Sequence, residues 1–221
     1  MRNNCATVAA IIPALNEAST VTSVVEQLAK RATVIVVDDG STDGTAQKAR
    51  QAGAIVIIHP FNKGYDAALA SGIHYAQELG FVYAVTLDAD GQHEPDRIDH
   101  FVASLENGSD IVIGVRDRQQ RFAEYVFASV SRRLWRIDDP LCGMKGYRLD
   151  RFRNAGPFDQ YKSIGTRYAI IAGRSRFIIR QIPVSVRPRI DAPRFASGWL
   201  GNFVILKAML LGLFLARSVR A

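Results

Sequence analysis

The stretch VTLDADGQH at residues 85–93 decides the fold, because an apolar strand ends there in two carboxylates. Side chains alternate along an extended backbone, so Asp88 and Asp90 can point the same way and share one hard divalent cation. At the carboxyl end of a strand in an open α/β sheet, such a cation would meet the diphosphate of a ligand. The stretch therefore indicates metal-assisted chemistry on a nucleotide derivative.

Two other interpretations of the same residues are open. Asp-x-Asp-Gly after a strand also forms a plain turn with a helix cap, since Asp tolerates turn geometry and Gly supplies a positive φ. A calcium-binding loop is disfavoured, because His93 stands where the EF-hand turn needs Gly and a strand precedes the loop in place of a helix.

Apolar runs alternate with segments of helical period on both sides of this stretch. Strands are predicted at residues 8–12, 34–37, 55–58, 82–87 and 111–115, and helices at 17–30, 43–52, 65–79 and 95–107. This order predicts a doubly wound α/β fold with a mainly parallel sheet and helices on both faces. The continuous run VIVV at 34–37 is typical of a strand covered on both faces.

The C-terminal part is predicted to hold helices at 122–137 and 166–172, a strand at 177–186 and an apolar helix at 199–216. Lys207 interrupts the last helix and Arg217 and Arg220 follow it. A helix on a membrane surface is the preferred interpretation, with a buried core helix and a membrane span as alternatives. We therefore expect a main domain at 1–197 and a membrane-associating helix at 198–221.

The composition points to an anionic partner. The chain has 221 residues, of which 48% are hydrophobic, and 28 Lys and Arg against 21 Asp and Glu give a formal net charge of +7. A phosphorylated substrate, an acidic membrane surface or a nucleic acid would fit this charge. Cys5 and Cys142 are too few for a disulfide framework, and no signal peptide is evident at the N-terminus, so a cytoplasmic location is expected.

Acidic residues also end the first two predicted strands. The first runs into Pro13 and Glu17, where a carboxylate could accept hydrogen bonds from a ribose or a base. The second ends in Asp38 and Asp39, which are costly to bury unless they are paired or functional. Asp39 is predicted to contact a nucleotide, whereas Asp38 could orient neighbouring loops. The loop at 62–65 could place N–H groups near phosphate, although it has no Walker A spacing.

Taken together, five segments resemble the ordered motifs of the family 2 inverting glycosyltransferases: IPALNE at 12–17, VVDDGSTD at 36–43, NKGY at 62–65, DADGQH at 88–93 and DPLCGMK at 139–145. More narrowly, they resemble the dolichyl- or polyprenyl-phosphate mannose and glucose synthases. The resemblance implies a GT-A-type, Rossmann-like fold that binds a UDP- or GDP-linked sugar through Mg²⁺ or Mn²⁺. It also implies a polyprenyl phosphate acceptor.

The resemblance further implies roles for individual positions. Nucleotide-sugar contacts are expected from Pro13, Leu15, Glu17, Val37, Asp39, Asp88, Ala89, Asp90 and Gln92, and metal contacts from Asp88, Asp90 and Gln92. Arg116 and Arg121 match phosphate-binding arginines, so the expected catalytic residues are Asp90, Arg116 and Arg121. Arg189 and Arg194 lie in a loop that departs from the family pattern; they are expected among the nucleotide-sugar contacts as phosphate-binding residues, with a solvated surface as the alternative. Independently of the resemblance, His59 and His93 are expected to be structural or peripheral.

Rival functions remain. Transfer to a sugar hydroxyl of a polysaccharide would need a carboxylate base, for which Asp139 is the candidate. A noncatalytic nucleotide-binding module is a second alternative. A nucleic-acid surface is disfavoured, because acids at Glu17, Asp39, Asp88 and Asp90 occupy the expected site. An anionic membrane surface is an expected partner, and the need for a membrane-protein partner is left open.

Overall fold

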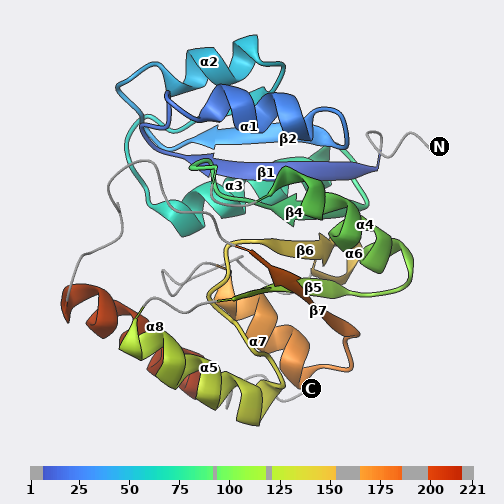
Figure 1. Cartoon of the computed structure of the whole chain (residues 1–221), viewed down its shortest axis with the longest axis vertical. Coiled ribbons are helices and arrows are strands. Elements are labelled where there is room, and N and C mark those ends of the chain that lie inside the picture. The colour runs from blue at the N-terminus through green and yellow to red at the C-terminus, as the bar shows by residue number, and fades with distance from the viewer. Residues whose placement is uncertain (1–6, 92–93, 118–120, 153–164, 186–198, 216–221) are drawn as a thin grey trace.

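The computed structural model describes residues 7–91, 94–117, 121–152, 165–185 and 199–215. Its strands form one sheet in the order β3-β2-β1-β4-β6-β5-β7 (Figure 1). The strands are β1 (Val8–Ala14), β2 (Thr33–Asp38), β3 (Ile55–Ile58), β4 (Tyr83–Thr86), β5 (Ile111–Arg116), β6 (Lys145–Arg148) and β7 (Ile179–Val184). The helices are α1 (Val21–Leu28), α2 (Thr45–Gln51), α3 (Tyr65–Glu78), the 3₁₀ helix η2 (Pro95–Arg97), α4 (Ile98–Glu106), α5 (Phe122–Trp135), α6 (Leu149–Phe152), α7 (Thr166–Arg174) and α8 (Trp199–Leu215).

Most neighbouring strands run parallel, as the alternation of strands and helices predicts. β1 pairs in parallel with β2 and β4, β2 with β3, and β5 with β7. The carboxyl ends of these strands therefore reach one edge of the sheet, which is where an open α/β fold binds its ligands.

Strand β6 differs from the expected pattern, because it lies antiparallel between β4 and β5. The sequence prediction has no strand here. The four residues KGYR at 145–148 form no apolar run, and their pairing is set by contacts distant in sequence. A short strand of this kind is stabilised by its neighbours and has little propensity of its own.

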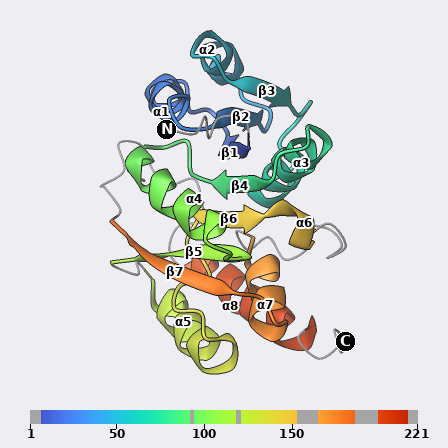
Figure 2. The same cartoon turned by 90° about the vertical axis from the view of Figure 1, so that its right-hand side faces the viewer.

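Both faces of the sheet are covered, and alternate residues of β1 show how. Ala9 and Ile11 belong to a core cluster that also contains residues of α3, α5 and α7. Val8, Ala10 and Ile12 belong to a second cluster with residues of α1 and α4. Figure 2 shows α1 and α4 on one side of the strands and α3, α6 and α7 on the other. The expected helices on both faces are confirmed.

Helix α8 packs on α5 and α7 and contributes Ile205 and Met209 to the first core cluster. In Figure 1, α5 and α8 lie at the end of the molecule opposite α2. Among the residues that the structure describes, no helix combines the length and the apolar character that crossing a membrane requires.

Candidate functional site

The strand register brings the predicted acidic loops to one edge. Ala14 at the end of β1 pairs with Asp38 of β2, and Ile11 pairs with Thr86 of β4. The N–H of Asp39 donates to the carbonyl of Ala14 at 2.8 Å. The segments after β1, β2 and β4 therefore lie next to one another, although they are separated by many residues in the sequence.

The loops after β1 and β2 are held together by hydrogen bonds. The Asn16 side chain accepts from the N–H of Thr42 at 2.9 Å, and the N–H of Asn16 donates to Ser41 Oγ at 2.8 Å. Asn16 has a φ of 52°, in the left-handed region that Asn tolerates better than most residues. Burial opposes ionisation of Asp43, but hydrogen bonds from Thr45 and from the N–H of Ala18 outweigh it and lower the Asp43 pKa.

The Asp39 carboxylate is buried and has three partners. It lies 2.6 Å from His59 Nδ1, and it accepts from the N–H groups of Lys63 at 2.9 Å and Gly64 at 2.7 Å. His59 Nε2 contacts Ser71 Oγ at 2.9 Å on its other side. Asp39 thus fixes the loop that leads into α3, and the expected structural placement of His59 agrees with these contacts.

Asp88 is partly buried at the end of β4 and has close neighbours on two sides. The Tyr65 hydroxyl donates to Asp88 Oδ1 at 2.6 Å. Desolvation and the adjacent Asp88 charge raise the pKa of Tyr65 well above its usual value, so the phenol stays protonated and remains a donor. On the other side, a Cβ added to Gly143 would lie 2.6 Å from Asp88 Oδ2. Only a glycine at 143 leaves this position of the carboxylate undisturbed.

Asp90 is buried, and Ala89 between the two acids belongs to the second core cluster. The third predicted metal ligand, Gln92, lies outside the described residues. Within the described part of the chain, no group of three or more His, Cys, Asp or Glu side chains could hold a metal ion. Mg²⁺ typically binds through one or two carboxylates plus substrate phosphates and waters. Asp88 and Asp90 supply two carboxylates, which is a number that such a cation takes from a protein.

Arg116 at the end of β5 is paired with two carboxylates. Its Nε and Nη2 donate to Asp139 at 2.7 and 3.0 Å, and Nη2 lies 3.2 Å from Glu124 of α5. Desolvation opposes the charge of this guanidinium, but Asp139 more than compensates, so the Arg116 pKa is raised. The three charged groups join β5, α5 and the turn before β6.

The turn at 139–143 connects Arg116 with Asp88. Asp139 in this turn accepts a hydrogen bond from Arg116, and Gly143 lies against the Asp88 carboxylate. The Thr86 hydroxyl donates to the Gly143 carbonyl at 2.7 Å, which fixes the turn to β4. Lys145 is buried and donates to the Cys142 carbonyl. Burial, followed by the Asp139 charge, raises the pKa of the Cys142 thiol to about 12.

The other predicted residues divide into four groups. Leu15 and Glu17 lie in the loop after β1, and Glu17 is buried. Pro13 and Val37 are buried and paired in β1 and β2, and the Val37 side chain lies beside Gly72 of α3. Arg121 immediately precedes α5, and its carbonyl accepts from the N–H of Glu124. Arg189, Arg194 and His93 lie outside the described residues.

Two residues that contact Asp88 are not singled out by the sequence prediction. Tyr65 belongs to the quoted motif at 62–65, but its hydroxyl contact with Asp88 depends on how α3 lies against β4. Gly143 is part of the Gly-flanked run before β6, and its closeness to Asp88 depends on the antiparallel pairing of β6 that the sequence does not predict. The Gly residue itself is the available signal, since glycine permits close approach.

With this geometry established, comparison with known proteins gives one family. The profile described as "Glycosyl transferase family 2" matches residues 9–182. A UDP-N-acetylglucosamine–dolichyl-phosphate N-acetylglucosaminyltransferase of Methanococcus voltae is 37% identical over 126 residues, which are 48% of this chain and 50% of that protein. A polyprenol monophosphomannose synthase of Mycolicibacterium smegmatis is 30% identical over 115 residues, covering 48% and 43% of the two chains. The chain thus spans about half the length of these curated relatives.

Among solved structures, glucosyl-3-phosphoglycerate synthase of Mycobacterium tuberculosis is similar over 99% of this chain and 84% of its own. The TM-score is 0.77 and the sequence identity is 22%. That structure is a complex with Mn²⁺, uridine diphosphate and glucosyl-3-phosphoglycerate. At this identity the likeness concerns the fold, and the expected GT-A-like α/β architecture is confirmed.

Proposed function

Because the chain belongs to glycosyl transferase family 2, we propose that it transfers a sugar from a UDP- or GDP-linked donor to a polyprenyl phosphate, with Mg²⁺ or Mn²⁺ as cofactor. The observation that carries the proposal is the meeting of Asp88, Tyr65 and Gly143 at the sheet edge. The arrangement supports the proposal because it holds a carboxylate at the carboxyl ends of the strands, the edge at which open α/β sheets bind nucleotides.

The donor half of the site is proposed to follow the strand ends. Leu15, Glu17 and Asp39 lie along the first two loops and would contact the nucleoside, with Pro13 and Val37 beneath them. Asp88 and Asp90, with Gln92, would hold the cation, and Ala89 would lie beside the diphosphate. The cation would neutralise charge on the departing nucleoside diphosphate.

The proposed acceptor is supported by two relatives. The M. voltae relative is named for transfer to dolichyl phosphate, and the M. smegmatis relative is named for a polyprenol monophosphomannose product. A lipid phosphate suits this site chemically because its oxygen is already anionic and needs no general base. The acceptor oxygen would bond to the anomeric carbon as the bond to the diphosphate breaks. The electron pair would leave with the diphosphate, and attack from the opposite face would invert the anomeric centre.

Arginines are proposed to position the acceptor phosphate. Arg121 lies at the start of α5, on the same side of the molecule as the end of β5 where Arg116 is found. Arg116 holds Asp139 through two short hydrogen bonds and Glu124 through one contact at 3.2 Å. A phosphate could displace Glu124 and leave the Asp139 pair intact. Arg189 and Arg194 are proposed as additional phosphate contacts.

Transfer to a sugar hydroxyl is the weaker candidate on the basis of Asp139. Both oxygens of this carboxylate accept hydrogen bonds from Arg116, and the N–H of Arg116 adds another at 3.2 Å. These contacts engage both oxygens of Asp139 with Arg116, so the carboxylate serves to hold this guanidinium. We therefore propose a lipid phosphate as the acceptor. Since such a lipid resides in a membrane, we also propose that the protein binds peripherally at the cytoplasmic face of a membrane, through a segment at 198–221.

The test is incubation with a panel of UDP- and GDP-sugars, polyprenyl phosphate in detergent and Mn²⁺, followed by mass analysis of the lipid fraction. A glycosylated lipid phosphate whose formation stops on metal chelation is the expected result. Donor binding without any product would indicate a nucleotide-binding module. A product found only with an added saccharide acceptor would overturn the lipid assignment.

A further inference from the structure

Helix α8 is apolar on nearly all sides, with Lys207 as its one charged residue, although only one of its faces is buried. Ile205, Ala208 and Met209 face the core. On the opposite side, Phe203, Leu210 and Phe214 are exposed, with 69% and 65% of the two Phe residues accessible. Their spacing of seven and four residues places them in one stripe. A helix that is apolar all round is normally buried on all sides, so this stripe lacks a cover within the described chain.

The neighbouring helix α5 also carries exposed aromatic side chains. Phe122 is 75% exposed and Tyr125 is exposed beside it, one turn along the helix. The two helices start side by side, because the Asn202 side chain accepts from the N–H of Ala123 at 3.3 Å. The surface formed by Phe122, Tyr125, Phe203, Leu210 and Phe214 is called the α5–α8 face below.

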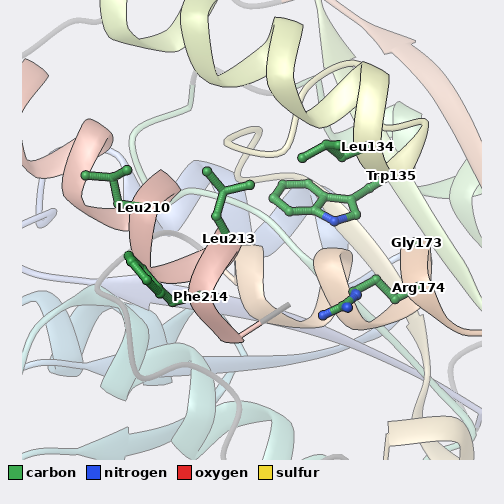
Figure 3. Close-up of a pocket in the computed structure, with 7 residues that line it drawn as sticks. All are labelled: Leu134, Trp135, Gly173, Arg174, Leu210, Leu213 and Phe214. Atoms are coloured by element: carbon green, nitrogen blue, oxygen red, sulfur yellow. The ribbon is translucent and has the colours of Figure 1, made fainter. Parts of the chain in front are cut away.

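A shallow apolar groove of about 660 Å³ continues the α5–α8 face toward the other ends of these helices. Leu210, Leu213 and Phe214 line it from α8, Leu134 and Trp135 from α5, and Gly173 and Arg174 from α7 (Figure 3). The groove has room for an acyl or isoprenoid chain, and the exposed Arg174 lies on its α7 side.

The charges around the α5–α8 face are almost all positive. Lys207 lies within the α8 stripe, and Arg132, Arg133 and Arg136 are exposed at the end of α5. On α5, α7 and α8, as far as the structure describes them, the one acidic side chain is Glu124, which is buried against Arg116. Asp138, just beyond α5, pairs with Arg132. An apolar surface with a basic rim is complementary to an anionic phospholipid bilayer.

We propose that the α5–α8 face docks on the surface of an anionic phospholipid bilayer, with its aromatic and Leu side chains among the acyl chains and its Lys and Arg residues at the headgroups. The inference deepens the proposed function and rests on it, since a lipid acceptor resides in such a bilayer. Arg121 and Glu124 at the start of α5 would then bring the site next to the membrane surface.

The experiment is flotation of the full chain with vesicles of phosphatidylcholine, with or without phosphatidylglycerol, in the absence of donor sugar. The wild-type protein is expected to float with the anionic vesicles. The variant Leu210→Asp with Phe214→Asp should remain at the bottom of the gradient. Its matched control is Leu79→Asp with Val82→Asp, which adds the same charge at two exposed apolar residues near the end of α3 and should float. Circular dichroism on all samples confirms that they are folded.

A second pair of variants tests the charge. Arg133→Gln with Arg136→Gln should weaken binding to anionic vesicles by about tenfold or more. Lys30→Gln with Arg50→Gln removes two exposed cations near α1 and α2 and should bind like wild type. Equal flotation of all variants would overturn the proposal. The proposal would also be overturned if the wild-type protein is a dimer that does not float and if Leu210→Asp with Phe214→Asp converts this dimer to a monomer.

The same samples separate this proposal from the proposed function. Sugar transfer to polyprenyl phosphate in detergent requires no bilayer. If the wild-type protein does not float but still transfers sugar in detergent, the α5–α8 face is rejected and the activity is kept. Flotation without transfer to any lipid phosphate would keep the membrane surface and reject the acceptor.

Discussion

Gly143 is the residue whose replacement most directly tests the position of Asp88. A methyl group at 143 would lie 2.6 Å from Asp88 Oδ2, so the carboxylate must move. Because a carboxylate is the mobile end of a side chain, we expect Gly143→Ala to fold with little loss of stability. Turnover should fall by about a hundredfold, since a displacement of this size misplaces a reacting group.

The control for this variant is Gly146→Ala, in β6, three residues further along the chain. Its added methyl would meet Leu105 and Phe101 in the core and not the site. Mn²⁺-dependent turnover and thermal unfolding are measured for both variants, which separates an effect on the position of Asp88 from an effect on stability. If Gly143→Ala keeps wild-type turnover, Asp88 has no role that depends on its position.

Asp90 is predicted to be essential for transfer. Asp90→Asn should fold, because the amide has nearly the same shape, and should lose almost all turnover, because the charge that attracts the cation is removed. The measurement is product formation across a Mn²⁺ titration, with circular dichroism as the check on folding. Wild-type turnover by a folded and still metal-dependent Asp90→Asn protein would contradict the assignment.

Cys142 should be inert toward thiol reagents in the native protein. Its pKa is raised to about 12, chiefly by burial, so the reactive thiolate is scarce below that pH. In a Cys5→Ser variant, modification should be slow at neutral pH and complete in denaturant. Because the folded pKa exceeds the unfolded value, the contribution of this thiol to stability is complete below about pH 9 and decreases as the pH rises toward 12. Rapid labelling at neutral pH would contradict the buried environment.

Sequence reasoning at the residue scale succeeds where contacts are local and fails where they are distant. Asp88 and Asp90 stand out because they end an apolar run. The partners of Asp39 could not be predicted, because Lys63 and Gly64 reach it from a loop more than 20 residues away. The same holds for Arg116, whose pairing with Asp139 and Glu124 depends on the turn before β6.

At the element scale, the buried charge network should contribute more stability than a surface pair. The variant Asp139→Asn removes the carboxylate that holds the buried Arg116. Among the residues that the structure describes, Glu124 is then the remaining carboxylate in contact with this guanidinium. We expect a loss of about 3 kcal/mol in the free energy of unfolding. The neighbouring Asp138→Asn removes an exposed pair with Arg132 and should cost about 0.5 kcal/mol. Denaturant titrations of both variants measure the loss in the free energy of unfolding. Equal losses would show that the buried network stabilises the fold no more than the surface pair does.

The elements with strong periodicity are those that the sequence predicts well. β3 has the expected residues 55–58, and α3 ends one residue before the expected end. Helix α1 starts at Val21 and not at 17, because the carbonyl of Glu17 closes a turn with the N–H groups of Thr20 and Val21. Strand β6 and the short helix α6 are absent from the prediction, since neither has an apolar pattern long enough to identify it.

At the scale of the whole molecule, α5 connects the site with the proposed membrane surface. Its first turn carries Glu124, which contacts Arg116, and Phe122 on the outer side. The donor half of the site, by contrast, is built from loops after β1, β2 and β4. Donor and membrane would therefore contact different parts of the chain that adjoin at the start of α5.

This separation predicts two distinct patterns of amide hydrogen exchange. A nucleoside diphosphate with Mn²⁺ should slow exchange at the sheet edge, at residues 14–18, 38–45 and 62–65, because these N–H groups line the proposed donor site. Anionic vesicles should instead slow exchange in α5 and α8, whose outer faces would leave water. Neutral vesicles and Mn²⁺ alone are the controls. The donor site would be contradicted if the nucleotide slows exchange in α5 and α8 and not at the sheet edge. The membrane surface would be contradicted if vesicles slow exchange in α1 and α2, which lie at the opposite end of the molecule.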